Sequence, residues 1–294
     1  LAHPQHTAVV QGKERLSFAE LNDKANRLAA YLLSIGVAQG DFIGLCFPPS
    51  IELSIALLAT LKTGAAYVPL DPSYPAERIN YMINNAGVKV LLGTHRTRIT
   101  GVEAERRVEI DTLALETFSP HNLAITIDAK QALYAIFTSG STGAPKAATV
   151  SHANENNLLQ WYASEFDLNL NDKFLVFSAI GFDLTQKNLL APLCMGAQLH
   201  FSVAEHYDPQ ALLNTIEQDG ITWINCAPSA FYPLTEAHSV AKLRSVKKLF
   251  FGGEPIRLDL MHNWLHSPYF HAQITNMYGP TECTDIATSF TLDD

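Results

Sequence analysis

Charged residues are scarce in this chain. They make up 17% of its 294 residues, whereas an average soluble protein has about 25%. The charge that is present is mostly acidic, with 20 Lys and Arg against 29 Asp and Glu and a formal net charge of −9. No basic run occurs in the sequence. The composition therefore argues against a protein that binds nucleic acid or an anionic membrane.

Cysteine is also rare and dispersed. Cys46, Cys194, Cys226 and Cys283 form no CxxC pair, and no histidine cluster has metal-ligand spacing. We expect all four to be small buried residues of strands, in a protein of the reducing cytoplasm.

Long hydrophobic runs are absent as well. The most apolar stretch, 51–66, contains Glu52, Lys62 and Gly64. It is shorter than the ~20 residues needed to span a bilayer, so it predicts a buried helix. No signal peptide is recognisable. Disorder is excluded by the 47% hydrophobic content, and a chain of this length buries roughly 75% of its unfolded surface.

Helix signals and apolar runs alternate along the chain. Ser17-Phe18-Ala19-Glu20 is a capping-box pattern, and apolar residues at helical spacing follow it as far as Gly36. Further helices are predicted over 50–62, 75–87, 151–166, 183–194, 208–220 and 257–265, and strands over 41–47, 67–70, 88–92, 132–137, 174–179, 221–227, 248–251 and 272–278. This alternation predicts an α/β protein with parallel sheet covered on both faces. The polar stretch 94–130 is the candidate seam within the chain.

Unusual segments follow four of the predicted strands. They are 182–183, 227–229, 252–254 and 278–282. In open α/β sheets, ligands bind outside the carboxyl ends of the strands. We therefore expect these segments to form one composite site.

A loop rich in glycine and hydroxyl groups is the strongest candidate for chemistry. Residues 138–146 read TSGSTGAPK, and its N–H groups and hydroxyls could wrap phosphate oxygens while Lys146 adds a positive charge. The loop is not a Walker motif, because Pro145 precedes the lysine and a strand-like run over 147–150 follows it. The alternative is an ordinary surface turn, since clusters of Gly, Ser and Thr are typical of loops.

The segment 276–282, NMYGPTE, offers a flat ring and a carboxylate. Tyr278 could stack on a planar group, and Glu282 could hold a hard cation. The alternative is a turn at the end of a strand with an exposed acid.

These two motifs occur together with four others: LSFAELN at 16–22, TGAAYVPLDPSYPAERI at 63–79, GFDLT at 181–185 and FGGEPI at 251–256. In this order they resemble the adenylation domains of nonribosomal peptide synthetases, within the adenylate-forming superfamily that includes acyl-CoA ligases and luciferases. The resemblance covers essentially the whole chain. It implies two mostly parallel sheets flanked by helices, the N-terminal core of an adenylate-forming enzyme.

The resemblance implies a site for ATP and Mg²⁺. The catalytic residues that it implies are Thr142, Lys146 and Glu282, with Glu282 as the magnesium ligand. The nucleotide-binding residues that it implies are Thr138, Ser139, Gly140, Ser141, Thr142, Gly143, Lys146, Gly253, Glu254, Asn276, Tyr278, Gly279 and Thr281. We expect Gly253 and Glu254 to shape the site rather than to catalyse.

Asp183 decides the substrate class, because it resembles the aspartate that pairs with the substrate's α-amino group. Taken by itself, an Asp at the start of a helix is typical of an N-cap. A charge pair at about 4 Å contributes roughly 4 kcal/mol at an effective dielectric of 20, which selects against acids without an amine. The side-chain pocket implied by the resemblance consists of Leu184, Lys187, Asn225, Phe250, Gly252, Met277, Asp285 and Ile286.

Lys187 and Asp285 are the charged members of this pocket. Lys187 follows Asp183 by four residues, so on a helix both face the same way. Asp285 could pair with Lys187 or with a basic group of the substrate; alternatively, each is a solvated surface charge. The expected substrate is an amino acid with a polar or charged side chain.

The resemblance implies a two-step reaction. The carboxylate of an amino acid attacks the α-phosphorus of ATP, which gives an aminoacyl adenylate and pyrophosphate. The phosphopantetheine thiol of a carrier-protein domain then takes the acyl group, and a neighbouring condensation domain is the other implied partner. Two alternatives stay open: an acyl- or aryl-CoA ligase of the same superfamily, and a non-catalytic module that binds nucleotide.

The sequence departs from the family pattern in two ways. Ala147 stands where the family usually has glycine after the loop lysine. The family's ribose-binding aspartate and its C-terminal lid, which carries a catalytic lysine, find no match before Asp294. We therefore expect 1–294 to be the larger N-terminal part of a catalytic core, excised from a longer polypeptide and weak or inactive by itself.

Overall fold

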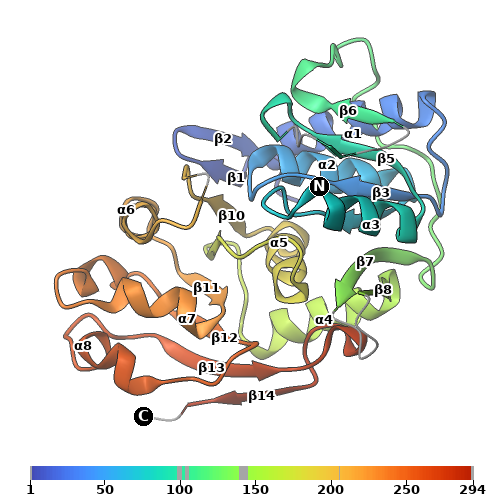
Figure 1. The fold of residues 1–294 in the computed structure, drawn as a ribbon. Coiled ribbons are helices and arrows are strands. Elements are labelled where there is room, and N and C mark those ends of the chain that lie inside the picture. Colours follow the sequence, from blue (N-terminus) through green and yellow to red (C-terminus); the bar gives the residue numbers. More distant parts are fainter. Residues whose placement is uncertain (1, 98–100, 103–105, 139–144, 205, 293–294) are drawn as a thin grey trace. The chain divides into compact units, whose positions relative to one another are not determined.

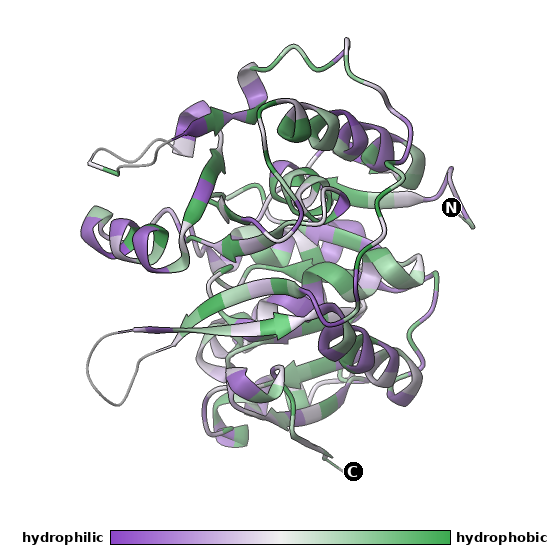
Figure 2. Cartoon of the chain, turned by 90° about the vertical axis from the view of Figure 1, so that its right-hand side faces the viewer, coloured by the Kyte–Doolittle hydropathy of each residue, from purple (hydrophilic) through white to green (hydrophobic). Residues whose placement is uncertain are grey.

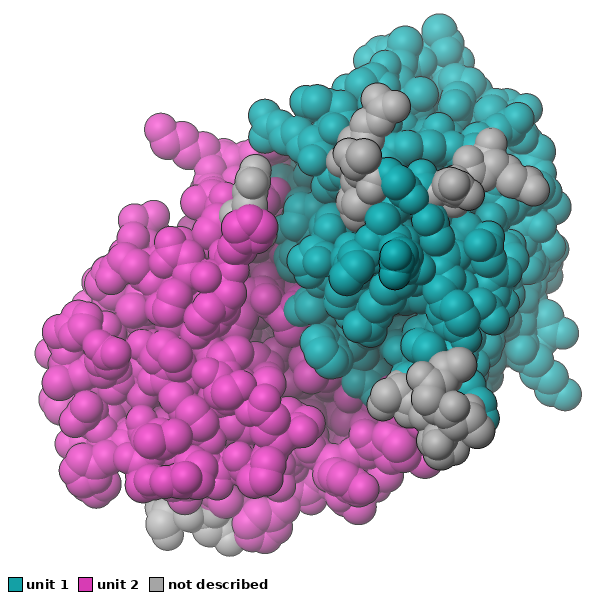
Figure 3. All heavy atoms as spheres, viewed as in Figure 1, with its two compact units in different colours: residues 1–6, 16–157, 179–183 teal, residues 7–15, 158–178, 184–294 magenta. Residues whose placement is uncertain are grey.

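The computed structural model describes residues 2–97, 101–102, 106–138, 145–204 and 206–292. The chain divides into two compact units, which are coloured separately in Figure 3. Unit 1 comprises Leu1–His6, Leu16–Asn157 and Ala179–Asp183, and unit 2 comprises Thr7–Arg15, Leu158–Ser178 and Leu184–Asp294. The predicted seam at 94–130 is wrong, because that stretch lies within unit 1. Its polar composition marks surface loops between short strands, not a boundary.

Unit 1 is built on a six-stranded sheet (Figure 1). In spatial order its strands are β6 (Arg107–Glu109), β5 (Val88–Gly93), β3 (Phe42–Leu45), β4 (Ala66–Pro69), β7 (Ala132–Thr138) and β8 (Lys146–Ser151). Neighbouring strands are parallel except for β7 and β8, which form an antiparallel pair. The strands β3, β4 and β5, which follow one another in the chain, are joined through α-helices, as parallel strands usually are.

The helices of unit 1 begin and end at the signals that the sequence contains. They are α1 (Phe18–Ser34), α2 (Ile51–Lys62) and α3 (Ala76–Ala86), with the 3-10 turns η1 (His95–Thr97) and η2 (Ile110–Thr112). The capping box is confirmed: Glu20 N–H donates to Ser17 Oγ at 3.2 Å, and Ser17 N–H donates to the Glu20 carboxylate at 2.8 Å. On α3, Ile79, Met82 and Ile83 face the sheet and join the core cluster of this unit.

Most of an eight-stranded sheet belongs to unit 2. Its order is β14 (Thr288–Thr291), β13 (Gln273–Tyr278), β12 (Lys248–Phe251), β11 (Trp223–Cys226), β9 (Lys173–Val176), β10 (Gln198–Phe201), β1 (Thr7–Gln11) and β2 (Glu14–Ser17). From β13 to β1 each neighbouring pair is parallel, and β14 is antiparallel to β13. The sequence did not predict β1, β2, β6, β10 or β14. The edge strands among them are short and partly exposed, so they lack a continuous apolar run.

Several helices and turns complete unit 2. They are α6 (Pro209–Asp219), α7 (Pro228–Phe231), α8 (His262–Leu265), η3 (Tyr232–Thr235), η4 (Val240–Leu243), η5 (Leu258–Met261) and η6 (Thr281–Cys283), together with α4 (His152–Glu165) and α5 (Asp183–Met195), which each begin in unit 1. Within the described residues, no helix combines the length and the apolar composition needed to cross a bilayer.

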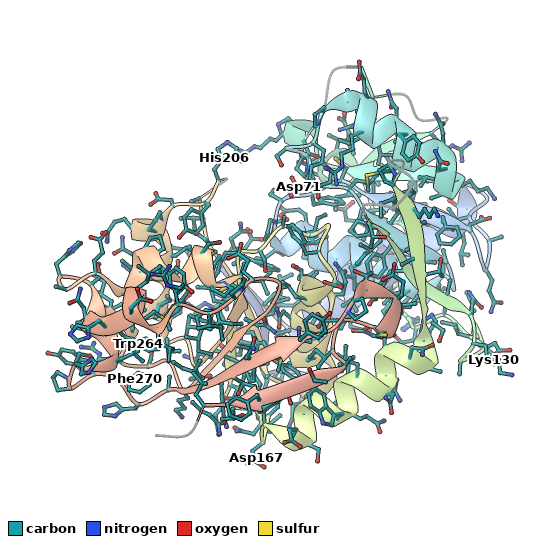
Figure 4. All side chains as sticks on the ribbon, turned by 60° about the horizontal axis from the view of Figure 1, so that its bottom comes forward. Asp71, Lys130, Asp167, His206, Trp264 and Phe270 are labelled. Carbon is teal, nitrogen blue, oxygen red and sulfur yellow. The ribbon has the colours of Figure 1, made fainter. Side chains whose placement is uncertain are left out.

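The two faces of the unit 2 sheet have different partners, because successive strand residues point to opposite sides. Leu249 and Phe251 of β12 join a core with α6, α7 and α8. Phe250, between them, faces α4 instead, with 5.2 Å between its ring centroid and that of Tyr162. Figure 2 shows hydrophobic segments on the strands and on the helices that cover them. In the α8 region, Trp264 and Phe270, labelled in Figure 4, meet edge to face at 5.0 Å.

The helix predicted over 257–265 is wrong in type. The 3-10 turn η5 leads into the single α-helical turn α8. Leu258 and Leu260 are exposed, whereas Met261 and Trp264 are fully buried. The buried pair is spaced by three residues, which suits a 3-10 turn, and the apolar residues form no single helical stripe.

The prediction for the cysteines is wrong for two of the four. Cys46, directly after β3, and Cys226, in β11, are buried, but Cys194 and Cys283 are exposed. Cys194 lies in the last turns of α5 and Cys283 in η6, so neither is in a strand. Burial raises the pKa of the Cys46 thiol to about 12, which keeps it protonated and unreactive.

Candidate functional site

Three of the predicted segments lie at one edge of the unit 2 sheet. β11, β12 and β13 are parallel neighbours, so the segments that follow them leave the sheet at the same edge. Two segments are bonded directly: Ser229 donates to the Glu254 carboxylate from its N–H at 3.1 Å and from its Oγ at 2.9 Å. The expected clustering therefore holds for the segments after these strands. The segment 182–183 falls in unit 1, and its place in the cluster stays a prediction.

The two charged residues of the predicted pocket form a buried ion pair. Lys187 Nζ lies 2.5 Å from Asp285 Oδ2, and the two side chains are 1% and 10% exposed. Lys187 Nζ also donates to the Leu184 carbonyl at 3.4 Å. Charges are rarely buried unless they are paired. Among the alternatives that the sequence left open, the structure therefore shows pairing and excludes solvation at the surface.

An aromatic floor, formed by Tyr162, Trp223 and Phe250, lies beside this pair. The Tyr162 ring is 5.5 Å from that of Trp223, and Lys187 Nζ is 5.8 Å from the Tyr162 ring centroid. Trp223 Nε1 donates to the Tyr162 hydroxyl at 2.6 Å. Burial raises the pKa of Tyr162 far above its usual range, against the opposing hydrogen bonds from Trp223 and Asn225. The floor is therefore an uncharged surface with two polar side-chain atoms, the Tyr162 hydroxyl and Trp223 Nε1, which are bonded to each other.

Asn225 and Met277 complete the buried part of the pocket. Asn225 Nδ2 lies 3.9 Å from Met277 Sδ, and both residues are buried. A Cβ added to Gly252 would be 3.4 Å from the Met277 carbonyl oxygen, an ordinary contact distance, so the ends of the two strands lie close together without a steric need for glycine. Leu184 and Ile286 are half-buried. Unit 2 thus brings together most residues of the predicted side-chain pocket. Ile286 is assigned to this group only because it follows Asp285 in the chain.

A tight turn between β13 and β14 positions Asp285. A Cβ added to Gly279 would be 2.2 Å from the Asp285 carbonyl oxygen, and Ala287 N–H donates to the Tyr278 carbonyl at 2.9 Å. Thr284 and Asp285 have φ angles of 64° and 69°. This left-handed region is unfavourable for residues other than glycine, and most of all for β-branched ones. The ion pair and the close packing at Gly279 hold the turn in this strained conformation.

The predicted nucleotide-binding residues of unit 2 lie at the surface. Tyr278 is 71% exposed, so its ring can stack on a planar ligand. Gly253, Glu254, Asn276 and Glu282 are exposed, and Gly279 and Thr281 are half-buried. Tyr278 immediately precedes the turn that carries Asp285. The ring that could hold a ligand and the acidic residue of the buried ion pair are therefore seven residues apart in the chain.

The donor set fits a magnesium ion that arrives with a nucleotide. In the part of the chain that the structure describes, no group of three or more His, Cys, Asp or Glu side chains could hold a metal. Mg²⁺ is usually bound by one or two carboxylates together with substrate phosphates and water. The exposed carboxylate of Glu282 in η6 meets that requirement.

The β7–β8 hairpin of unit 1 holds the described ends of the predicted phosphate loop. Thr138 pairs with Lys146 across the hairpin, and its Oγ1 donates to the Lys146 carbonyl at 3.5 Å. The Tyr81 hydroxyl donates to the Pro145 carbonyl at 2.9 Å, and the Lys146 side chain is exposed. Outside the described residues lie Ser139, Gly140, Ser141, Thr142 and Gly143. Their phosphate contacts stay predictions.

Asp183 is the first residue of α5 and is half-buried. An acidic side chain is favourable at a helix N-terminus because it complements the helix dipole. Both interpretations of Asp183, as a helix-start residue and as the partner of an α-ammonium group, are compatible with this position. The second stays a prediction.

Tyr162 lies beside the predicted pocket, and the sequence did not indicate it. Tyr162 and Phe166 are four residues apart on α4 and both are buried, a stripe typical of any core helix. The sequence gives no sign that this stripe faces β11 and β12, because those strands begin 61 and 86 residues after Tyr162. Ser229 belongs to the predicted segment 227–229, but its contact with Glu254 was not visible in the sequence.

Comparison with known proteins identifies the family. Residues 1–294 match the family described as AMP-binding enzyme. The chain belongs to this family of AMP-binding enzymes.

The curated relatives are nonribosomal peptide synthases and related synthases. The dimodular nonribosomal peptide synthase of Bacillus subtilis (strain 168) is 35% identical over 300 residues, covering 96% of this chain and 12% of that protein. Indigoidine synthase of Streptomyces lavendulae is 31% identical over 308 residues, covering 99% of this chain and 23% of that protein. The chain therefore spans a small part of the length of these relatives.

Solved structures confirm the predicted fold class, two mostly parallel sheets flanked by helices. A variant of the nonribosomal peptide synthetase FmoA3, in its alpha-methyl-L-serine-AMP bound form, has a TM-score of 0.91 and 26% identity, covering 99% of this chain and 33% of that one. The N-terminal subdomain of Klebsiella oxytoca NpsA, in complex with 3-hydroxyanthranilyl-AMSN, has a TM-score of 0.88 and 25% identity, covering 100% of this chain and 74% of that one.

Proposed function

We propose that this chain activates an amino acid as its aminoacyl adenylate, as part of an adenylation domain of a nonribosomal peptide synthetase. One observation carries the proposal: the turn after β13 joins the buried Lys187–Asp285 pair to the exposed ring of Tyr278. The acidic member of the buried ion pair and a stacking surface for a flat base thus lie on one short segment. The nonribosomal peptide synthase relatives support the same function.

Different residues would bind the adenine, the phosphates and the magnesium ion of ATP. Tyr278 and Asn276 would hold the adenine, and Gly279, Thr281, Gly253 and Glu254 would shape its surroundings. Thr138 and Lys146, with the loop between them that includes Thr142, would hold the phosphates. Glu282 would hold Mg²⁺, which supplies neutralisation of phosphate charge. In a chain with a net charge of −9, such local positive groups let a carboxylate approach a polyphosphate.

The amino acid would be held at both of its ends. The Asp183 carboxylate would pair with the α-ammonium group, which orients the substrate carboxylate. The side chain would enter the pocket formed by Leu184, Lys187, Asn225, Phe250, Gly252, Met277, Asp285 and Ile286. Two charged residues in that set support a polar or charged substrate side chain.

The same proposal includes two partner domains and a cellular location for this chain. A carrier-protein domain would accept the acyl group on its phosphopantetheine thiol, and a condensation domain would be a neighbour, as the relatives' role in peptide synthesis suggests. We propose that the chain is the larger N-terminal part of a catalytic core. Its four cysteines are free, which is compatible with the reducing cytoplasm.

Two non-hydrolysable adenylate analogues that differ only in the α-amino group test this function. In calorimetric titrations of the polypeptide in which the chain naturally occurs, we expect the analogue with the amine to bind at least tenfold more tightly, and Asp183→Asn to remove the difference, because the ion pair with the ammonium is lost. Asp167→Asn, at an exposed aspartate, is the control. Equal binding of both analogues to the unmodified chain would favour an acyl- or aryl-CoA ligase, and binding of neither would contradict the proposal.

A further inference from the structure

Resting on the proposed function, we infer that the side-chain pocket selects an amino acid whose side chain is uncharged and forms hydrogen bonds, such as an amide or a hydroxyl. The pocket contains one positive and one negative group, and these groups already neutralise each other. The selection follows from that neutrality and from the hydrogen-bonding groups around it.

A charged substrate side chain is disfavoured by the ion pair. Lys187 and Asp285 are 2.5 Å apart and at most 10% exposed, so each is the other's main compensation for lost hydration. A charged substrate side chain beside the pair would lose its hydration, while both possible counter-charges are already engaged with each other. If it displaced Lys187 or Asp285, the displaced group would lose its ion-pair partner without a substitute. The other residues of the predicted pocket carry no charge that could offset it.

The same groups disfavour a hydrocarbon side chain. The Lys187 ammonium has three N–H groups, of which two donate to Asp285 and Leu184. A carboxylate has about four lone-pair sites, so Asp285 can accept a further hydrogen bond besides those it makes. Asn225 forms a hydrogen bond with the Tyr162 hydroxyl, and its Nδ2 lies 3.9 Å from the Met277 thioether sulfur, a weak acceptor. A buried site with such donors and acceptors rejects an analogue without the matching polar group, by up to about 10⁴-fold.

An uncharged polar side chain fits both constraints. An amide or hydroxyl accepts from Lys187 and donates to Asp285 without adding charge, so the pair stays intact. The aromatic floor excludes water from beneath these bonds, which increases their selectivity.

Aminoacyl-adenylate analogues with side chains of similar size test the inference on the unmodified polypeptide in which the chain naturally occurs. One set carries the side chains of asparagine, aspartate, leucine and 2,4-diaminobutyrate; a longer set carries those of glutamine, glutamate, methionine and ornithine; a short pair carries those of threonine and valine. We expect the tightest-binding set to show at least a tenfold preference, by calorimetry, for its amide or hydroxyl member. A charged or hydrocarbon member that binds as tightly overturns the inference but leaves the proposed function standing. Binding of none of the analogues contradicts the proposed function itself.

Removal of one charge should change the preference in a predictable direction. Lys187→Met removes the positive member of the ion pair with Asp285, so the ornithine analogue should gain at least tenfold relative to the glutamine analogue. Asp285→Asn should favour the glutamate analogue in the same way. Because each result is a ratio within one protein preparation, a general loss of stability does not produce it. The control Lys242→Met breaks a partly exposed contact with Glu217 at 3.9 Å in the same unit and should leave the ratios unchanged. An unaltered amide preference in both pocket variants would overturn the inference.

Discussion

At the scale of single residues, loss of the Lys187 side chain should lower the free energy of unfolding most. Its side chain is 1% exposed and bonded to Asp285, so Lys187→Met leaves a buried carboxylate without its partner. We expect the free energy of unfolding to fall by about 3–5 kcal/mol. The control Lys242→Met affects a partly exposed pair and should cost about 0–1 kcal/mol. Urea titrations of both variants measure this, and equal losses would show that the pair is not buried in solution.

The sequence predicted the identity of the pocket residues better than their contacts. Lys187 and Asp285 were both assigned to the pocket, but 98 residues separate them, and their residue types are equally compatible with solvation. Tyr162 was missed for the related reason that its contact with Trp223 depends on the packing of α4 on the sheet. Residue types predict chemistry, whereas a contact between distant residues depends on the whole fold.

At the scale of elements, the turn between β13 and β14 is the most constrained segment of the site. A Cβ on Gly279 would lie 2.2 Å from a backbone oxygen, so Gly279→Ala must displace the turn that carries Asp285. We expect a loss of about 1–3 kcal/mol in the free energy of unfolding, typical of overpacking. Gly252→Ala is the steric control, because its Cβ would be 3.4 Å from the nearest atom and should cost less. Denaturation of both variants in urea measures the difference, and an equally stable Gly279→Ala would contradict this account of the turn.

The contact between β10 and α6 should make stability depend on acid pH. His200 is buried and its Nδ1 lies 3.0 Å from Asp219 Oδ2; this hydrogen bond lowers the pKa of Asp219. The ionised carboxylate therefore stabilises the fold above the unfolded-state pKa of about 3.9, and the contribution is lost as the pH falls through the lower folded pKa.

Asp219→Asn should accordingly lower the free energy of unfolding by about 1–2 kcal/mol at pH 7 and by less at pH 3. Glu217→Gln, on the same helix, is the control and should show little difference between the two pH values, because its ion pair is weak and partly exposed. Urea titrations at both pH values provide the comparison. A loss from Asp219→Asn that is the same at both would exclude the carboxylate charge as its cause.

Elements with local signals were predicted and those without were not. α1 begins after its capping box, and α6 lies between the N-cap Asp208 and the left-handed Gly220, both of which are visible in the sequence. In contrast, β14 has exposed side chains and exists because it pairs with β13. The segment 257–265 became a 3-10 turn and a single helical turn because only Met261 and Trp264 are buried in it. Tertiary packing decided these cases.

At the scale of the whole molecule, the sequence predicted the α/β class but not the division into units. Unit 2 combines 7–15 and 158–178 with 184–294, so its sheet is assembled from segments that lie far apart in the chain. No change in composition marks such a boundary, and the polar stretch 94–130 was a misleading signal. Strand order in a parallel sheet depends on crossover connections, which local patterns do not encode.

The central claim is that this chain serves amino-acid activation, and amino-acid-dependent exchange of labelled pyrophosphate into ATP tests it most directly. The measurement uses the polypeptide in which the chain naturally occurs, with and without Asp183→Asn. We predict exchange that requires an amino acid with an uncharged polar side chain and falls at least a hundredfold in the variant. Exchange that an acid without an α-amino group supports equally well, or no exchange with any amino acid, would contradict the account.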